Sequence, residues 1–224
     1  MLLQLPKVLA RPQLTQVREL LSQAQFADGK LSAGAEAERV KNNQEMSQGS
    51  ELYTKLNNIV MVSLVNHTVY QQAAFPHRIA APFYARYTTG MTYGDHVDDP
   101  IMGPVGQRYR SDISITVFLS EPHEYEGGEL TIRTAFGDQQ VKLAAGDAIL
   151  YPSSSLHQVA PVSRGERLVA VTWLQSMIRD PGKRELLYEL GQAREKLLRN
   201  AADQEETAWV SNVYVNLVRR WSEL

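Results

Sequence analysis

The sequence predicts an α+β fold with a mainly β core, a sandwich or jelly roll, flanked by N-terminal helices and a C-terminal helical extension. From residue 78 to 176, short β-rich runs alternate with glycine-containing turns, a pattern typical of such cores. On either side of this region, apolar residues recur at helical spacing. We therefore divide the chain into residues 1–77, a strand and helices that pack on the core; residues 78–177, the β domain; and residues 178–224, a helical extension.

Before the β region we expect a strand over residues 2–9, a helix over 13–25, a loop over 26–49 and a helix over 50–69. The loop is expected because this stretch is rich in glycine, alanine, serine, asparagine and charged residues. The helices are expected from the spacing of their apolar residues, which are Leu14, Val17, Leu20 and Leu21 in the first and Leu52, Leu56, Ile59 and Val60 in the second.

Six β-rich runs are the expected strands of the core: 111–119, 129–134, 139–143, 147–151, 157–161 and 167–174. In the first run, Ile113, Ile115 and Val117 share one face, and the hydroxyls of Ser114 and Thr116 lie on the other. We expect the apolar face to pack against helices and the hydroxyl face to line a pocket, although an ordinary half-exposed strand would show the same alternation. The two apolar stripes after residue 180 either pack on the β core or join two chains in a homo-oligomer.

Composition excludes several classes of function. With 224 residues, 43% of them apolar, the chain can bury a substantial core. The 23 basic and 25 acidic residues give no basic excess for nucleic acid, and no apolar run is long enough for a membrane span. Residues 1–11 make a poor secretory signal, so we expect a cytoplasmic protein. Because the chain has no cysteine, histidine and carboxylate are the expected metal ligands.

A candidate metal site consists of His96, Asp98 and His157. On an extended strand His96 and Asp98, two residues apart, share one face, and His157 opens a later strand after a proline-started loop. Two imidazoles and one carboxylate can occupy one face of an iron(II) ion and leave the other face open for a cosubstrate and O2. The other three histidines, His67, His77 and His123, lie outside this motif run and are expected to be surface or structural residues.

Arg167 suggests a site for an anion. It begins the alternation Arg167, Val169, Val171, Trp173, and if its strand neighbours that of His157 its guanidinium lies deep in the core. A buried arginine needs an anionic partner, and a carboxylate binds it in a bidentate manner. The alternative is a structural ion pair, with Glu129 as the candidate partner. Asp95 and Asp99 flank the proposed ligands but would face away from them on an extended strand.

These motifs, in order, resemble a known family. They are Ala85-Arg-Tyr87, Gly90, Tyr93, His96-Val-Asp98, Phe118-Leu-Ser120, Glu126-Gly-Gly-Glu-Leu130, Gly146-Asp147, Tyr151-Pro152, His157 and Arg167. The set is similar to the prolyl-4-hydroxylase-like branch of the Fe(II)/2-oxoglutarate dioxygenases. More narrowly, it resembles the bacterial PKHD-type hydroxylases, a group associated with iron uptake. The resemblance covers about residues 78–177, and the flanking regions resemble that group with less specific signals.

The resemblance implies a double-stranded β-helix, with residues 78–177 as the Fe(II)/2-oxoglutarate dioxygenase domain. It implies iron ligation by His96, Asp98 and His157, binding of the distal 2-oxoglutarate carboxylate by Arg167, and a supporting role for Tyr87. No catalytic residue beyond the metal centre is then required. Phe118 departs from the pattern, because some relatives have a tyrosine there that touches 2-oxoglutarate; the hydroxyls of Ser114 and Thr116 are candidates to compensate.

The activity so implied is hydroxylation of an unidentified peptidyl or small-molecule substrate, with O2 consumed and 2-oxoglutarate decarboxylated to succinate. L-ascorbate is the reductant commonly assigned to the family. Two other classes of function are compatible with the same residues. One is a non-catalytic sensor of iron or 2-oxoglutarate, and the other is a cupin-like zinc or manganese isomerase or hydrolase, which usually needs an additional ligand or an acid/base residue.

Overall fold

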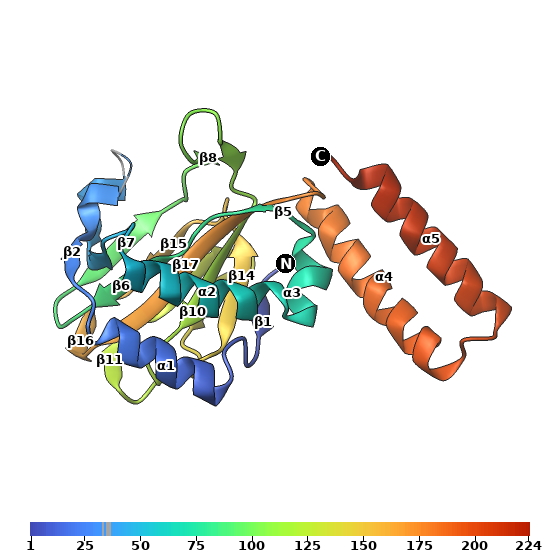
Figure 1. Cartoon of the computed structure of the whole chain (residues 1–224). Coiled ribbons are helices and arrows are strands. Elements are labelled where there is room, and N and C mark those ends of the chain that lie inside the picture. The colour runs from blue at the N-terminus through green and yellow to red at the C-terminus, as the bar shows by residue number, and fades with distance from the viewer. Residues whose placement is uncertain (33, 35–36) are drawn as a thin grey trace.

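A computed structural model of the chain describes residues 1–32, 34 and 37–224 (Figure 1). The helices are α1 (Arg11–Leu21), α2 (Glu51–Val65), α3 (Thr68–Ala74), α4 (Pro181–Asn200) and α5 (Glu205–Trp221), with short 3-10 helices η1 (Gly29–Ser32) and η2 (Ala37–Arg39). The strands are β1 (Leu3–Leu5), β2 (Phe26–Asp28), β3 (Lys41–Asn42), β4 (Gln44–Met46), β5 (Pro76–Ile79), β6 (Phe83–Tyr87), β7 (Thr92–His96), β8 (Ile101–Met102), β9 (Tyr109–Arg110), β10 (Ile113–Phe118), β11 (Tyr125–Gly127), β12 (Leu130–Thr134), β13 (Gly137–Val141), β14 (Ala148–Pro152), β15 (His157–Val159), β16 (Val162–Gly165) and β17 (Arg167–Ser176).

Two antiparallel sheets form the core. The larger has the order β1-β14-β10-β17-β6-β4-β2, with β5 also paired to β17, and the smaller has the order β13-β12-β15-β7-β3. Two ribbons, β11–β16 and β8–β9, complete the pairing. The six strands expected in the core are all present, as β10, β12, β13, β14, β15 and β17. The predicted fold class, a mainly β core with helices at both ends of the chain, is confirmed.

Strand β10 shows how the sequence builds the layers. Ile113, Ile115 and Val117 belong to one apolar cluster with Leu56 and Val60 of α2, so the large sheet is covered on this face by α1 and α2, which run across it in Figure 1. On the opposite face, the ring of Phe118 joins a second cluster between the sheets. Every residue of β10 is buried, which rules out the half-exposed alternative. The apolar face packs against helices as expected, and on the other face Thr116, but not Ser114, lines a cavity.

The loop expected over residues 26–49 is wrong in large part. Strands β2 and β4 extend the large sheet beyond β6, and β3 extends the small sheet beyond β7, through the pairs Gln44↔Arg86 and Lys41↔Tyr93. These strands are two or three residues long and mostly polar, so no alternation marks them in the sequence. Residues 33, 35 and 36 of the expected loop lie outside the described residues.

The other N-terminal elements differ in their bounds from those expected. The expected strand over residues 2–9 is only three residues long, because Pro6 and then Lys7, with φ of 56°, end it. The expected helix over 50–69 is two helices, α2 and α3. The side chain of Ser50 caps α2 and that of His67 caps α3.

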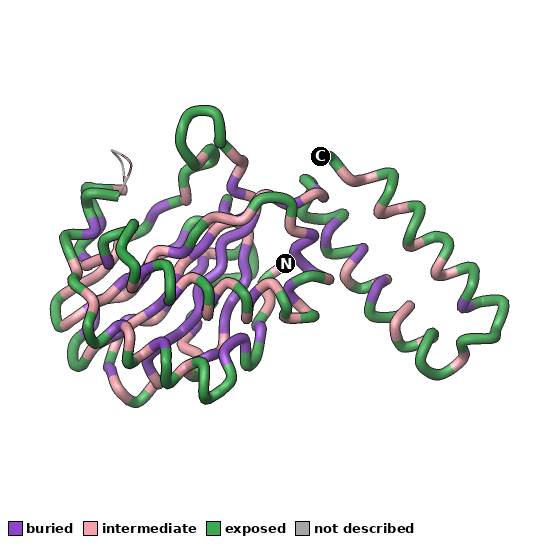
Figure 2. The backbone as a smooth tube through the Cα atoms, viewed as in Figure 1, coloured by how far each residue is buried: buried purple, intermediate pink, exposed green. Residues whose placement is uncertain are grey.

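Helices α4 and α5 form a hairpin that projects from the β core (Figure 1), and much of its surface is exposed (Figure 2). Its base is held by Leu187, which packs with Phe75 and Ile178, and by Arg184, whose guanidinium donates to the Ile178 carbonyl oxygen at 2.7 Å. The helices therefore pack on the β core only at one end. Among the described residues, no helix is long and apolar enough to cross a membrane.

Candidate functional site

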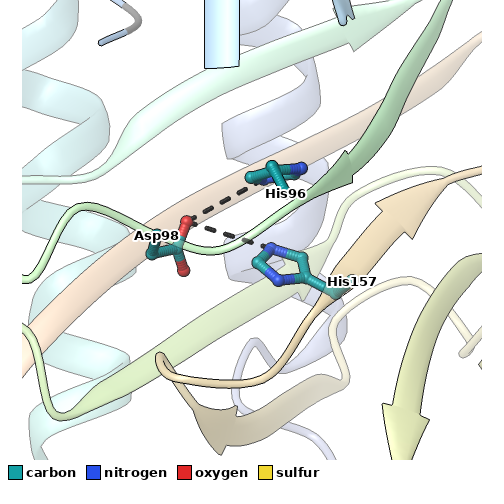
Figure 3. Close-up of side chains that lie close together, drawn as sticks. All are labelled: His96, Asp98 and His157. Carbon is teal, nitrogen blue, oxygen red and sulfur yellow. Dashed lines mark ion pairs between the residues drawn. The ribbon is translucent and has the colours of Figure 1, made fainter. Parts of the chain in front are cut away.

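The two predicted histidine ligands are direct partners across neighbouring strands. His96 ends β7 and His157 begins β15, and the register pairs them, which brings their ring centroids to 4.2 Å. The Asp98 Oδ1 atom lies 3.9 Å from the Nε2 atom of each histidine (Figure 3). One ligand atom from each residue lies within 4.8 Å of the others, so a single ion could be held by all three. The predicted convergence is confirmed.

The placement of Asp98 differs from the expectation in one respect. Strand β7 ends at His96, so Asp98 lies in the loop that follows and does not alternate with His96 on one strand. Its position is fixed by β10 instead, because Ser114 Oγ donates to Asp98 Oδ2 at 2.5 Å, and Ser153 Oγ lies 2.8 Å from Ser114 Oγ. This leaves Oδ1 free to face the two imidazoles. The sequence placed Ser114 only on a pocket wall, and nothing in it pointed to Ser153.

Backbone carbonyls orient both imidazoles. The Nδ1 atom of His96 lies 2.8 Å from the Gly94 carbonyl oxygen, and that of His157 lies 3.0 Å from the Ser155 carbonyl oxygen. Because a carbonyl only accepts hydrogen bonds, each Nδ1 carries the proton and each Nε2 keeps its lone pair, which is the form that binds metal. Burial, and next the charge of His157, lower the pKa of His96 to about 4, so His96 stays neutral at physiological pH.

Arg167 lies on the opposite wall of the core. Its strand, β17, pairs with β10 and β6 in the large sheet, so the condition under which the sequence placed it in the core, a strand next to that of His157, is not met. The side chain is nevertheless buried, with 1% of the residue exposed. Its Nε and Nη1 atoms have no hydrogen-bond partner among the described residues. The alternative ion pair is not formed, because Glu129 instead lies 3.7 Å from Lys142 Nζ.

A buried guanidinium with unused donors fits a carboxylate ligand, since two parallel N–H groups match its two oxygens. Aromatic rings flank the guanidinium carbon: the Tyr87 ring centroid is 5.0 Å away and that of Phe118 is 5.6 Å away. Tyr87 is the direct partner of Arg167 across β6 and β17, and burial raises the pKa of its hydroxyl. The donor set present therefore fits both a metal ion and an anionic organic ligand.

The hydroxyls considered as substitutes for a tyrosine at Phe118 have other neighbours. Ser114 donates a hydrogen bond to Asp98. Thr116 lies beside Tyr151: burial raises the pKa of the Tyr151 hydroxyl well above its usual value, and the interaction with Thr116 lowers it by less. A different tyrosine, Tyr125 on β11, is buried beside Arg167, and its hydroxyl has no partner in the part of the chain that the structure describes. No spacing in the sequence relates it to the motif.

The metal triad and the buried arginine share one cavity of about 940 Å³. It is lined by the triad, by Arg167 and Tyr87, by the 101–109 loop with β8 and β9, and by Lys41, Asn43 and Glu45 of the N-terminal segment. No signal in the sequence marked these three residues, because the short strands β3 and β4 that hold or flank them lie in a stretch expected to be a loop. The cavity is large enough for a dicarboxylate beside the triad together with a second, larger molecule.

Of the two aspartates that flank the ligands, Asp95 lies as expected, exposed and in an ion pair with Arg133. Asp99 is exposed but lines the same cavity as the triad, which the expected strand geometry did not predict. His67 caps α3, and His77 and His123 are exposed. None of these five belongs to the group of residues that could hold a metal ion.

Comparisons with known proteins agree with this geometry. A family model described as the 2OG-Fe(II) oxygenase superfamily matches residues 82–175, and one described as the PKHD-type hydroxylase C-terminal domain matches residues 182–223. The chain is 52% identical to a PKHD-type hydroxylase of Thioalkalivibrio sulfidiphilus and 43% identical to one of Escherichia coli O17:K52:H18, each over the full length of both chains.

Solved structures with low sequence identity share the fold. A prolyl-4-hydroxylase of Pseudomonas putida superposes with a TM-score of 0.52 at 18% identity, over 78% of this chain and 92% of that one. A prolyl hydroxylase of Trichoplax adhaerens, in complex with a peptide of hypoxia inducible factor, superposes with a TM-score of 0.55 at 17% identity, over 83% of this chain and 86% of that one.

Replacing Ser114 by alanine should weaken metal binding about 10- to 100-fold, as is typical for the loss of a hydrogen bond that orients a ligand. The change removes the side-chain hydrogen bond that Asp98 Oδ2 accepts and lets the carboxylate rotate. Anaerobic titration with Fe(II) or Co(II) measures the effect. Ser120→Ala, which alters a buried serine just beyond the other end of β10, is the control; equal losses in both variants would contradict the assignment.

Proposed function

Because this chain belongs to the PKHD-type hydroxylases of the 2OG-Fe(II) oxygenase superfamily, we propose that it hydroxylates its substrate in the cavity between the two sheets. The observation that carries this proposal is the meeting of His96, Asp98 and His157 opposite a buried arginine with unused donors. Fe(II) and 2-oxoglutarate are the metal and cosubstrate of this family. When bound, they supply the oxidation of a C–H bond by O2, coupled to conversion of 2-oxoglutarate to succinate.

The residues of the triad hold and orient the metal. His96 and His157 present the lone pairs of their Nε2 atoms, because both Nδ1 protons are donated to carbonyl oxygens. Asp98 presents Oδ1, because Oδ2 accepts from Ser114. All three residues line the cavity, so an ion held by them would remain accessible to ligands from it. No protein acid or base is needed for the oxidation itself, so the chain contributes geometry, charge and exclusion of water.

Arg167 and Tyr87 are the residues we assign to the cosubstrate. Arg167 offers Nε and Nη1, both buried and without a hydrogen-bond partner among described residues, to the distal carboxylate of 2-oxoglutarate. Tyr87 presents its buried phenol beside that guanidinium. Burial strengthens these contacts, because a charge-assisted hydrogen bond is stronger away from water. The other end of the dicarboxylate then faces the triad across the same cavity.

The substrate class that we propose remains broad, a peptidyl residue or a small molecule. The cavity is lined by the N-terminal segment and the 101–109 loop, and its volume exceeds what 2-oxoglutarate needs. The solved relatives named above act as prolyl hydroxylases, which supports a peptidyl substrate by analogy only. L-ascorbate as reductant and a cytoplasmic location stay part of the proposal, as expected from the sequence.

The competing functions have weaker support. A cupin-like isomerase or hydrolase usually has an additional metal ligand, and the described residues provide no fourth histidine or carboxylate in the metal group. A non-catalytic sensor would bind the same two ligands without turnover. Measured release of succinate separates a sensor from an oxygenase.

Asp98→Ala should abolish Fe(II)-dependent conversion of 2-oxoglutarate to succinate, because two imidazoles alone do not complete the facial set. Succinate is measured by chromatography and mass spectrometry under air, with and without iron. Asp95→Ala is a matched control, since Asp95 is an exposed neighbour that pairs with Arg133. Turnover in the Asp98 variant equal to that of the Asp95 variant would refute the proposed metal site.

Arg167→Ala should raise the Kd for 2-oxoglutarate far more than it changes the Kd for iron. Loss of a buried charge-assisted contact costs about 2–5 kcal/mol, which corresponds to roughly 30-fold to several thousandfold in affinity. Titration calorimetry under argon, with Mn(II) in place of iron, gives the Kd of the metal and the Kd of 2-oxoglutarate. Arg164→Ala, which alters an exposed ion pair with Glu126, should leave both unchanged. An unaltered 2-oxoglutarate affinity in the Arg167 variant would remove this residue from its role.

We also propose that the chain forms a homodimer through α5. Trp209 and Val213 are exposed on one stripe of this helix, at 57% and 53%. Glu206 and Arg220 are exposed and lie seven residues before and after Val213, on the same stripe. In an antiparallel pair of α5 helices centred on Val213, Glu206 of each chain would face Arg220 of the partner, so the charges complement each other around an apolar centre.

Reversal of this charge pattern tests the dimer. In sedimentation velocity, Glu206→Arg and Arg220→Glu should each weaken association about tenfold, since like charges then meet twice in the symmetric pair. The double variant should restore it. Glu206 in the first turn and Arg220 in the last turn also interact favourably with the dipole of their own helix, and the double variant reverses both of these interactions. Association restored in the double variant would therefore come from pairing between chains and not from an effect within one helix. A monomeric wild-type protein, or a double variant weaker than both single ones, would exclude this dimer.

A further inference from the structure

A lysine of the N-terminal segment lies close to the metal triad. Lys41 is on β3, and the register makes it the direct partner of Tyr93 on β7. Its Nζ atom is positioned over the Tyr93 ring, 5.3 Å from the centroid. The side chain is only 7% exposed, so the attraction between the ammonium and the ring is weakly screened by water.

Tyr93 in turn stacks on the metal-ligand candidate His96. The two ring centroids are 3.6 Å apart and the ring planes differ by 10°. A stacked neighbour restricts rotation of the imidazole about its side-chain bonds. Lys41, Tyr93 and His96 therefore form one line of contacts that ends at the triad.

The ammonium of Lys41 is itself fixed. Its Nζ atom donates to Glu45 Oε1 at 2.6 Å and to Ser32 Oγ at 2.9 Å, and the Ser32 hydroxyl donates to Glu45 Oε2 at 2.5 Å. Burial of such an ion pair costs desolvation, and apolar residues in its place are often equally stable or more so. Stability alone therefore does not account for a buried charged pair at this position.

The backbone of the same segment also reaches the strand of His96. Gly94 donates its N–H to the Val40 carbonyl oxygen at 2.9 Å, and the Gly94 carbonyl oxygen accepts from His96 Nδ1 at 2.8 Å. A Cβ atom at Gly94 would lie only 3.0 Å from Val40 Cβ, so the close approach of β7 to the residue before β3 favours a glycine. The N-terminal segment is thus linked to His96 in two ways, through the backbone of Gly94 and through the side chain of Tyr93.

We propose that Lys41 is a positioning residue for the metal centre. Its ammonium holds the Tyr93 ring against His96 and so keeps the imidazole Nε2 directed at Asp98. Glu45 and Ser32 act by holding the ammonium in place. The inference rests on the proposed function, because it assumes that the triad binds a metal ion. It gives a role in the metal site to the N-terminal segment, which lies outside residues 78–177.

The test is Co(II) binding to the apoprotein without 2-oxoglutarate, followed by visible absorption, which reports both affinity and ligand geometry. In Lys41→Met/Glu45→Gln, both charges are removed together so that no carboxylate is left buried and unpaired. We expect the Kd for Co(II) to rise about tenfold or more and the absorption bands to shift, because the imidazole is less well oriented. The thermal midpoint is recorded alongside.

A second lysine offers a matched control. Lys142 also lies over a tyrosine ring, that of Tyr125, at 4.1 Å, and also faces a glutamate, Glu129, at 3.7 Å, but that tyrosine does not stack on a triad residue. Lys142→Met/Glu129→Gln removes the same chemistry elsewhere and should leave Co(II) affinity and spectrum unchanged. A wild-type spectrum and affinity in the Lys41/Glu45 variant, or an equal change in both double variants, would overturn the proposal.

Substitutions at Tyr93 provide an independent route if the Lys41/Glu45 variant does not fold. Tyr93→Phe keeps the ring and should bind Co(II) like the wild type, whereas Tyr93→Leu removes the stack and should weaken binding to a similar extent as the double variant. Equal affinities in the two Tyr93 variants would refute the role of the stack. Failure of the wild-type chain to bind Co(II) would instead refute the proposed function, so the two failures are distinguishable.

Discussion

The register between β7 and β15 is the constraint on which the site depends. Because side chains alternate along a strand, a slip of one residue would turn His96 or His157 away from the core and separate the two imidazoles. Between the pairs His157↔His96 and Val159↔Tyr93 the register shifts by one residue, and this bulge on β7 puts Tyr93 on the same inner face as His96, where it packs in one cluster with Val159. Hydrogen bonds from both Nδ1 atoms to nearby carbonyls then fix the rings in place.

The second requirement is that two sheets face each other across a space that side chains do not fill. The small sheet supplies the imidazoles, and the large sheet supplies Arg167 from β17 and the Ser114 hydroxyl from β10. Packed sheets lie about 10 Å apart, so a dicarboxylate held by the guanidinium would extend toward the triad in this space. Asp98 belongs to neither sheet, and the hydrogen bond from Ser114 ties its loop to the large one.

Much of this arrangement could be predicted from the sequence, because its signals were strong and local. Strand β10 alternates clearly, and the spacing of His96, Asp98 and His157 carries recognisable chemistry. What could not be predicted depends on tertiary pairing. Strands β2 to β4 are too short and polar to show a period, Arg167 could be placed inside the core but not in the correct sheet, and no spacing relates Ser153 to Asp98.

The N-terminal segment has a structural role that links these observations. Without β3 and β4, the strand that carries His96 and the strand that carries Tyr87 would both become sheet edges with unpaired backbone groups. The same segment closes one side of the cavity with polar side chains, whereas α1 and α2 only cover the outer face of the large sheet. Residues far before the motif run thus stabilise the strands that carry the ligands and also determine what the cavity presents to a substrate.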